Sequence, residues 1–264
     1  MSRKFSPEMN QPLESRELPT AQLAHAEVFK IRNTVSPKSI INPAQNATQK
    51  SLLGQYLFNG NPFDSTGKNG SVNLTNTSFK NKALYLNGVY EYNGKGQGYR
   101  AWTEARNLSY NRFTVALTFN AEKFSMDQIA TPLVVGGEWY RWFVLKRSQD
   151  GKLAVTLNNH INNYTSDLNT KIHAGMWNTV VCGIDVSKRR LTAYMNGKLM
   201  IDVNLPSDFS FTVADSDQKL IDKKWTFTNY SNGTAFNGLI DTFSYYDRKL
   251  TNYEMQKLSA QGRK

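Results

Sequence analysis

Carboxylate side chains are the first candidates for chemistry, because a retaining glycosidase needs two of them about 5 Å apart. The sequence has nine glutamates. They are scattered along the chain, and no such pair with an aspartate is apparent from their spacing. The three histidines, His25, His160 and His173, suggest no Ser-His-Asp arrangement. We therefore predict that the protein is not an enzyme.

The single cysteine, Cys182, is a second candidate for reactivity. It lies in the apolar run Thr179-Val-Val-Cys-Gly-Ile, which is typical of a strand. A thiol in such a run is expected to be buried and inert rather than nucleophilic. One cysteine also excludes an internal disulfide framework.

Aromatic side chains could stack on the faces of sugar rings, with polar neighbours supplying hydrogen bonds. Two segments, residues 99–102 and 136–143, are rich in such side chains. Trp139 and Trp142 have opposite strand parity, so at least one is expected to face the core, and for each ring core packing is the alternative. The glycan-binding candidates are Trp102, Trp139, Tyr140, Arg141 and Trp142.

The chain after residue 50 consists of apolar and aromatic runs separated by turn residues, a pattern typical of β-strands. We expect the candidate residues above to lie on or between these strands. The dipeptides Asp150-Gly and Asn196-Gly each lie between two apolar runs and predict hairpins. Many antiparallel strands over some 210 residues indicate an all-β fold with a single β-sandwich. The predicted strands are Leu52–Phe58, Ala83–Tyr90, Arg112–Phe119, Trp139–Lys146, Leu153–Leu157, Trp177–Ile184, Arg190–Met195, Trp225–Phe227 and Leu239–Tyr246.

A short helix is predicted near the end of the chain. Thr251-Asn-Tyr-Glu254 is a capping box, in which the threonine hydroxyl caps an early amide and the glutamate reaches back. Leu250 and Met255 occupy the positions of a hydrophobic staple, and Leu258 continues the apolar face. We expect this helix to pack on the sandwich.

The net charge of +11 raises the question of a polyanionic partner. Nucleic-acid-binding proteins usually concentrate their basic residues on one stripe, helix or tail. Here they come as pairs and triplets, such as Lys188-Arg189-Arg190, at turns between predicted strands. The charge favours a positive surface that aids solubility and association with anionic partners, and nucleic acid is not the expected ligand.

Residues 1–50 differ from the rest, because they hold five of the eight prolines and no alternating apolar pattern. They predict an extended N-terminal arm, with residues 51–264 as the folded domain.

No apolar run approaches the roughly 20 residues of a membrane span, and the basic start lacks the apolar segment of a signal peptide. The expected location is a virion or a cytoplasmic assembly, or the extracellular space by a non-standard route. The expected anchors of the arm on other protein subunits are Leu23, Val28, Phe29 and Ile31.

Five segments, in order along residues 52–260, together resemble the laminin-G-like (LamG-like) family of concanavalin-A-like jelly rolls. The resemblance implies a jelly-roll β-sandwich for residues 51–264, and this fold hosts lectins, glucanases and scaffold domains alike. The five segments are Tyr56-Leu-Phe-Asn-Gly-Asn-Pro-Phe-Asp-Ser-Thr-Gly-Lys-Asn, Lys82-Ala-Leu-Tyr-Leu-Asn-Gly, Trp177-Asn-Thr-Val-Val, Leu191-Thr-Ala-Tyr-Met-Asn-Gly-Lys-Leu and Phe236-Asn-Gly-Leu-Ile-Asp with the helix start after it.

The resemblance also implies a structural calcium ion, held in many relatives by the aspartates that match Asp64 and Asp241. Strand alternation predicts that Asp241 points to the same side as Leu239, Phe243 and Tyr245. A carboxylate on an apolar face must be satisfied. Calcium would need six to eight oxygen ligands, and the alternative is that Asp241 accepts backbone amides or pairs with a lysine.

Taken together, the sequence predicts a non-enzymatic structural or attachment component of a larger assembly. A phage or viral virion protein, such as a decoration, collar, fibre or tail protein, fits this prediction, and contact with glycans is compatible with it. The alternative is a carbohydrate-binding, lectin-like adhesion or accessory protein.

Overall fold

The computed structural model describes residues 43–75, 77–88, 100–123, 131–137, 142–148, 150–158, 163–211, 224–227 and 236–263. The predicted arm up to residue 42, with its anchors Leu23, Val28, Phe29 and Ile31, lies outside these residues. The arm, its partners and the domain boundary at residue 50 therefore stay predictions.

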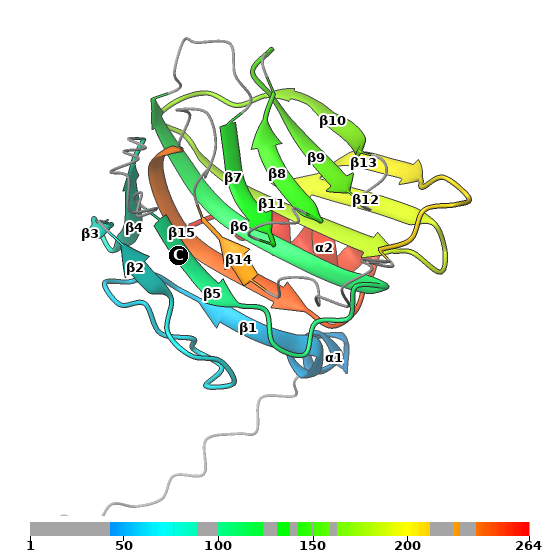
Figure 1. Cartoon of the computed structure of the whole chain (residues 1–264), viewed down its shortest axis with the longest axis horizontal. Coiled ribbons are helices and arrows are strands. Elements are labelled where there is room, and N and C mark those ends of the chain that lie inside the picture. Colours follow the sequence, from blue (N-terminus) through cyan, green and yellow to red (C-terminus); the bar gives the residue numbers. More distant parts are fainter. Residues whose placement is uncertain are drawn as a thin grey trace, which may run out of the picture. The chain divides into compact units, whose positions relative to one another are not determined.

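Two antiparallel sheets form the domain (Figure 1). The larger sheet has the strand order β13-β12-β11-β6-β15-β4-β3, and β1 pairs with the second half of β15. Its strands are β1 (Leu52–Tyr56), β3 (Ser78–Lys80), β4 (Ala83–Asn87), β6 (Arg112–Lys123), β11 (Trp177–Asp185), β12 (Arg190–Met195), β13 (Lys198–Asn204) and β15 (Asn237–Tyr246).

The smaller sheet has the order β10-β9-β8-β7-β14-β5-β2. Its strands are β2 (Asn73–Thr75), β5 (Arg100–Glu104), β7 (Thr131–Gly136), β8 (Phe143–Arg147), β9 (Lys152–Asn158), β10 (Asn163–Lys171) and β14 (Lys224–Thr226). The two sheets make a jelly-roll-like sandwich, which confirms the predicted fold class.

The core lies between the sheets and is rich in aromatic rings from both. Trp225 of β14 lies 5.4 Å from Phe243 of β15, and Phe143 of β8 lies 6.1 Å from Phe113 of β6, measured between ring centroids. Cys182 of β11 faces this core, and burial raises the pKa of its thiol to about 12. The predicted burial of the thiol is confirmed, and its raised pKa agrees with the prediction that it is inert.

Helix α2 (Asn252–Ser259) covers part of the outer face of the larger sheet. Thr251 and Glu254 form the predicted capping box. Met255 is fully buried in a second apolar cluster with Ala116, Val181 and other outward-facing residues of this sheet. A Cβ atom at Gly183 would lie 2.7 Å from the Met255 sulfur, so the glycine lets the helix approach the sheet closely.

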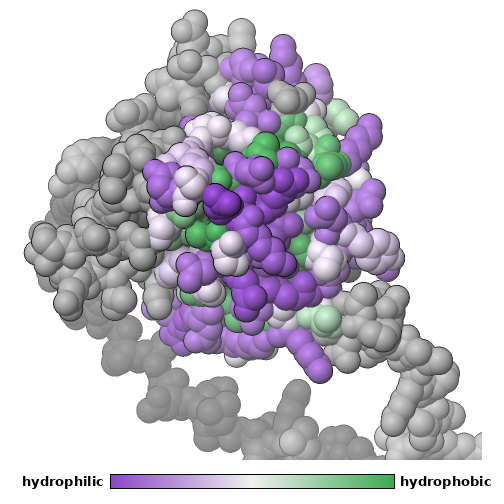
Figure 2. Space-filling view, turned by 90° about the vertical axis from the view of Figure 1, so that its right-hand side faces the viewer, coloured by the Kyte–Doolittle hydropathy of each residue, from purple (hydrophilic) through white to green (hydrophobic). Residues whose placement is uncertain are grey.

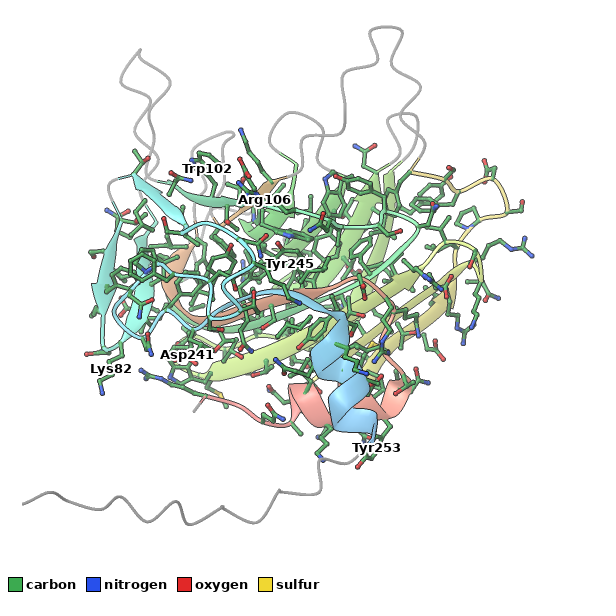
Figure 3. All side chains as sticks on the ribbon, turned by 90° about the horizontal axis from the view of Figure 1, so that it is seen from below. Lys82, Trp102, Arg106, Asp241, Tyr245 and Tyr253 are labelled. Atoms are coloured by element: carbon green, nitrogen blue, oxygen red, sulfur yellow. The ribbon has the colours of Figure 1, made fainter. Side chains whose placement is uncertain are left out.

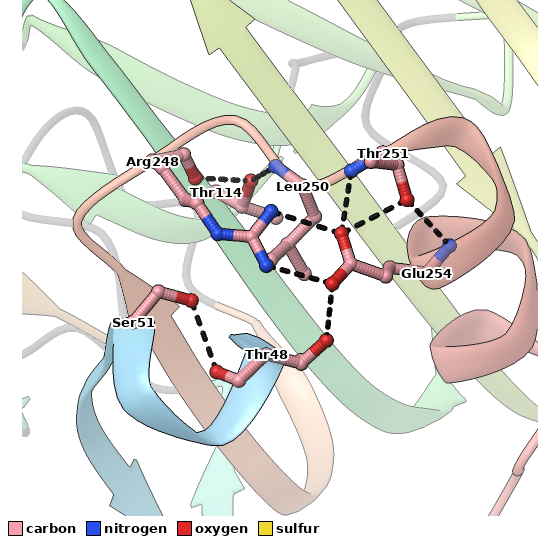
Figure 4. A network of polar contacts seen from close by, with 7 residues as sticks. All are labelled: Thr48, Ser51, Thr114, Arg248, Leu250, Thr251 and Glu254. Atoms are coloured by element: carbon pink, nitrogen blue, oxygen red, sulfur yellow. Dashed lines mark hydrogen bonds and ion pairs between the residues drawn. The ribbon is translucent and has the colours of Figure 1, made fainter. Parts of the chain in front are cut away.

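The carboxylate of Glu254 is the centre of a polar network at the start of α2 (Figure 4). Arg248 donates to both of its oxygens, at 2.9 and 2.7 Å. The backbone N–H of Thr251 donates to it at 2.8 Å, and the hydroxyl of Thr48 donates from α1. These donors, Arg248 above all, lower the pKa of Glu254 to about 2 although burial alone would raise it.

Helix α1 (Pro43–Ser51) occupies residues that were predicted to be extended, so the prediction is wrong for the end of the arm. Proline is favoured at the first position of a helix, where its missing N–H costs nothing, and the alanines and glutamines that follow form helices readily. Thr48 then fixes this helix to Glu254 of α2. Neither described helix, at nine and eight residues, is long enough to cross a membrane.

The predicted hairpins are confirmed. β8 and β9 are joined through Asp150-Gly151, and β12 and β13 through Asn196-Gly197, with positive φ angles at both glycines and at Asn196. Lys188 and Arg189 lie at a turn as expected, whereas Arg190 is the first residue of β12 and forms a two-pronged ion pair with Asp202. The described surface seen in Figure 2 is mostly hydrophilic, with hydrophobic colour in smaller areas.

Candidate binding face

One row of side chains crosses the outer face of the smaller sheet. Ala101 and Thr103, on either side of Trp102 in β5, face the core, so Trp102 points outward. The short side chains at the centre of the row are buried, whereas Trp102 is partly exposed and Asn73 is exposed. From β10 to β2 the row is Thr165, Thr156, Val144, Val135, Thr226, Trp102 and Asn73.

Trp102 lies among polar groups from two strands. The ammonium group of Lys224, on β14, lies 4.8 Å from the centroid of its ring, which is a cation–π contact. Glu104, two residues after Trp102, accepts a hydrogen bond from Arg106 at 2.7 Å. Figure 3 shows Trp102 and Arg106 on the same side of the sandwich and Tyr253 of α2 on the opposite side. An aromatic ring next to an amide, a carboxylate and two cations can hold a polyhydroxyl ring by stacking and hydrogen bonds.

Trp142 has a different position from the one expected of a ligand-binding residue. It is 3% exposed, and its ring contacts Trp225 at 4.9 Å and Phe113 at 5.4 Å. A Cβ atom at Gly136 would lie 2.5 Å from the Trp142 ring, so the ring packs directly on the backbone of β7. The structure thus places Trp142 in the core, the alternative given above. Trp139, Tyr140 and Arg141 lie outside the described residues and stay predictions.

The carboxylate of Asp64 is enclosed by hydrogen-bond donors from its own loop and from β1. Its oxygens accept from the backbone N–H groups of Gln55, Thr66 and Asn69 at 2.8 to 3.0 Å. The side chains of Thr66 and Asn69 donate to it as well. Burial alone would raise the pKa of Asp64, but these hydrogen bonds outweigh burial and lower it.

Asp241 does not share a face with Phe243 and Tyr245, so the prediction from strand alternation is wrong. The pairing of β15 with β6 is irregular between Ile240 and Thr242, which leaves Asp241 as an extra residue in a β-bulge. The bulge shifts the alternation, and Ile240, Phe243 and Tyr245 face the core instead. Asp241 accepts from the guanidinium of Arg263 at 3.1 Å and from the hydroxyl of Thr242 at 3.1 Å.

These surroundings do not fit a calcium ion shared by Asp64 and Asp241. Calcium needs six to eight oxygen ligands, whereas five hydrogen-bond donors point at Asp64 and a cation is already paired with Asp241. Among the described residues, no group of three or more His, Cys, Asp or Glu side chains could hold a metal ion. The geometry instead favours the alternative of direct pairing, with arginine in place of the expected lysine.

The sequence did not point to Lys224 as a neighbour of Trp102. The two residues are far apart in the chain and come together because β14 pairs with β5. No local pattern signals this contact, since Lys224 belongs to a basic pair like several others in the sequence.

Residues 93–256 of the chain match the sequence model of the concanavalin A-like lectin/glucanase superfamily. A comparison of the chain with curated proteins found no match. Among solved structures, the chain is similar to domain 4 of AbnA, an extracellular GH43 arabinanase from Geobacillus stearothermophilus in complex with arabinotriose. The TM-score is 0.62 at 21% identity, and the match covers 79% of this chain and 98% of that domain.

Two further similar structures come from botulinum neurotoxins. One, from a study of ganglioside-dependent cell entry of type C toxin, has a TM-score of 0.63 at 12% identity and covers 81% of this chain. The other, the binding domain of neurotoxin DC in complex with rat synaptotagmin II, has a TM-score of 0.63 at 13% identity and covers 80%. The chain spans about half of each toxin chain, 52%. At these identities the likeness shows the fold.

Proposed function

The chain belongs to the concanavalin A-like lectin/glucanase superfamily, and from this membership we propose that it is a glycan-binding module rather than an enzyme. The proposed binding face is the outer face of the smaller sheet, at the end where β5 and β2 lie. The observation that carries the proposal is Trp102, which points out of the sandwich beside Lys224, Glu104 and Asn73.

The described acidic residues of this face support binding rather than glycoside hydrolysis. On the strands of the smaller sheet they are Glu104 of β5 and Asp167 of β10. Five strand-to-strand steps separate β5 from β10, which is roughly 24 Å at about 4.8 Å per step. A retaining glycosidase needs its two carboxyl groups about 5 Å apart. Glu104 is also paired with Arg106.

Similar structures guide the choice of ligands to test. Arabinotriose is bound to the arabinanase domain, and gangliosides and a sialylated ligand are named for the toxin domains. A panel of neutral oligosaccharides that includes arabinotriose, together with ganglioside headgroups, covers both neutral and acidic glycans. Lys224 and Arg106 would favour the acidic members of the panel.

The test is to measure the affinity of the full chain for this panel and then to replace Trp102. We expect Trp102→Ala to weaken the binding of a bound glycan at least tenfold, or about 1.4 kcal/mol. The matched control is Tyr253→Ala, because Tyr253 is an exposed aromatic residue with a lysine, Lys257, over its ring, and it lies on the opposite face. Unchanged affinity in Trp102→Ala would place the site elsewhere, and no binding to any member of the panel would contradict the function.

The second candidate function is that of a structural or attachment component of an assembly, including a viral one. The observation that favours it is helix α1, which Thr48 fixes to Glu254 and which therefore anchors the end of the predicted arm to the folded domain. Deletion of residues 1–42, which keeps α1, should then abolish incorporation into the assembly and leave glycan binding unchanged. Normal assembly of the shortened chain would contradict this role.

A further inference from the structure

The outer face of the larger sheet has a covered part and an open part. Val181 and Ala116, which are paired in the register of β11 and β6, are apolar and pack with Met255 of α2. The adjacent row on the same face is polar and consists of three residues, one from each of the strands β11, β6 and β15. These residues are Thr179, Thr118 and Thr242.

A pocket of about 60 Å³ lies between this threonine row and the C-terminal end of α2. The sheet supplies the hydroxyl groups of Thr118, Thr179, Thr242 and Ser244. Amide side chains stand on two sides, Gln55 from β1 and Gln261 from the segment after α2. The volume holds about four water-sized groups at roughly 15 Å³ each, which is less than a whole sugar ring.

The segment after α2 is held in place, so that the pocket keeps its shape. Arg263 pairs with Asp241 at 3.1 Å, and its guanidinium group lies 4.6 Å from the centroid of the Trp177 ring. It also donates to the backbone carbonyl of Asn81. These contacts fix Gln261 and Gly262, which line the pocket, against the sheet.

The hydroxyl group of Thr242 donates to Asp241 and can still accept a hydrogen bond, and the other hydroxyl groups of the pocket also have capacity left for a ligand. Thr118 and Thr179 share one hydrogen bond at 3.0 Å, so one hydroxyl hydrogen of this pair is free to be donated elsewhere. Ser244 accepts from Gln55 at 3.4 Å, a long bond that a ligand could replace. The described lining carries no charged side chain, and Leu57 and Leu258 add apolar surface. Such a lining suits a neutral molecule with hydroxyl groups on one edge and C–H groups beside them.

We propose that this pocket binds the hydroxyl-bearing edge of a neutral sugar residue, as a second glycan site on the face opposite Trp102. Two or three hydroxyl groups of the sugar would enter, and the remainder of the ring would lie against Leu57, which is 37% exposed. The inference is independent of the proposed function, because none of the residues around Trp102 takes part.

The test uses the full chain with NMR labels on its threonine methyl groups, titrated with methyl glycosides of glucose, galactose, mannose and arabinose. The methyl signals of Thr118, Thr179 and Thr242 report on the pocket, and those of Thr156, Thr165 and Thr226 report on the face of the smaller sheet. We expect at least one glycoside to shift the pocket signals in a saturable way. Thr242→Val, which keeps the side-chain volume but removes one hydroxyl and its hydrogen bond to Asp241, should weaken this binding at least tenfold.

Two further variants complete the design. Thr118→Val should act like Thr242→Val, and Thr156→Val, the matched control on the smaller sheet, should leave the pocket titration unchanged. The inference is wrong if no glycoside shifts the pocket signals, or if both pocket variants bind as the parent does. Shifts confined to the signals of Thr156, Thr165 and Thr226 would support the proposed function alone, and shifts confined to the pocket would support the inference alone.

Discussion

On the outer face of the larger sheet, Arg248 and Glu254 form an ion pair at 2.7 Å, and on the outer face of the smaller sheet Arg106 and Glu104 form another at the same distance. Their surroundings differ. The Glu254 side chain is 8% exposed and accepts hydrogen bonds from three residues, whereas the Glu104 side chain is 53% exposed. The same pair of residue types is therefore largely buried in the fold on one face and largely exposed to water on the other.

The two faces also each carry an aromatic ring with a lysine over it. On α2, Lys257 lies over Tyr253 at 5.9 Å, as residues four apart on a helix do. On the smaller sheet, Lys224 lies over Trp102 at 4.8 Å, and the contact exists because two strands pair. The first contact follows from local spacing, and the second follows from the whole topology. This contrast separates what stabilises the domain from what we propose for binding.

The largest expected effect on stability comes from removing the side chain of Met255, which packs α2 on the outer face of the larger sheet. Met255→Ala should lower the free energy of unfolding by about 2–5 kcal/mol, because Met255 is fully buried and the change leaves a cavity. Leu258→Ala should cost less, since Leu258 is only partly buried. Urea denaturation followed by circular dichroism measures both.

One result for Met255→Ala and Leu258→Ala would contradict this prediction. Equal stability of Met255→Ala and the parent would show that α2 does not close this face. Glycan binding at the Trp102 face should be unchanged in both variants at temperatures where they remain folded, since neither residue lies on that face.

The next effect compares the two glutamates directly. Glu254→Ala should cost about 3 kcal/mol, the low end for breaking a buried pair, because Arg248 is 27% exposed and water compensates it in part. Glu104→Ala, the matched exposed pair, should cost at most about 1 kcal/mol. Similar losses in the two variants would mean that burial does not distinguish the faces.

The pH dependence of stability tests whether the carboxylate of Glu254 stabilises the fold. The pKa of Glu254 is lowered from about 4.5 to about 2 on folding, so its stabilisation is present above pH 4.5 and is lost as the pH falls toward 2. Asp64, whose pKa is also lowered, contributes in the acidic range too. The expected result is that the stability difference between the parent and Glu254→Gln shrinks between pH 5 and pH 2. A constant difference would contradict the low pKa.

The features that sequence predicted well are local ones. The capping box depends on four consecutive residues, Thr251 to Glu254, and the hairpins depend on the dipeptides Asp150-Gly and Asn196-Gly. The burial of Cys182 follows from the apolar run around it. In each case the interacting groups are neighbours in the chain, so the pattern contains the whole interaction.

The features that sequence did not predict depend on pairing between distant segments. A β-bulge at Asp241 reversed the face expected from alternation, and nothing in the local sequence requires that bulge. The contact of Lys224 with Trp102, and the row of Thr118, Thr179 and Thr242, arise from the order of strands in each sheet. Helix α1 was missed because a proline-rich segment favours extended chain, and its docking partner, Glu254, is 206 residues away from Thr48.

The smallest expected effect concerns the cap of α2 alone. The Thr251 hydroxyl accepts from the Glu254 N–H at 3.3 Å and donates to the Glu254 carboxylate at 2.9 Å. Thr251→Ala should therefore cost about 1 kcal/mol, the usual loss for an N-cap, and Thr251→Ser, which keeps the hydroxyl, should cost much less. Because Arg248 and Thr48 still hold Glu254, the loss should remain well below that of Glu254→Ala. A loss in Thr251→Ala as large as that in Glu254→Ala, measured by the same urea denaturation, would show that the cap rather than the ion pair closes this face.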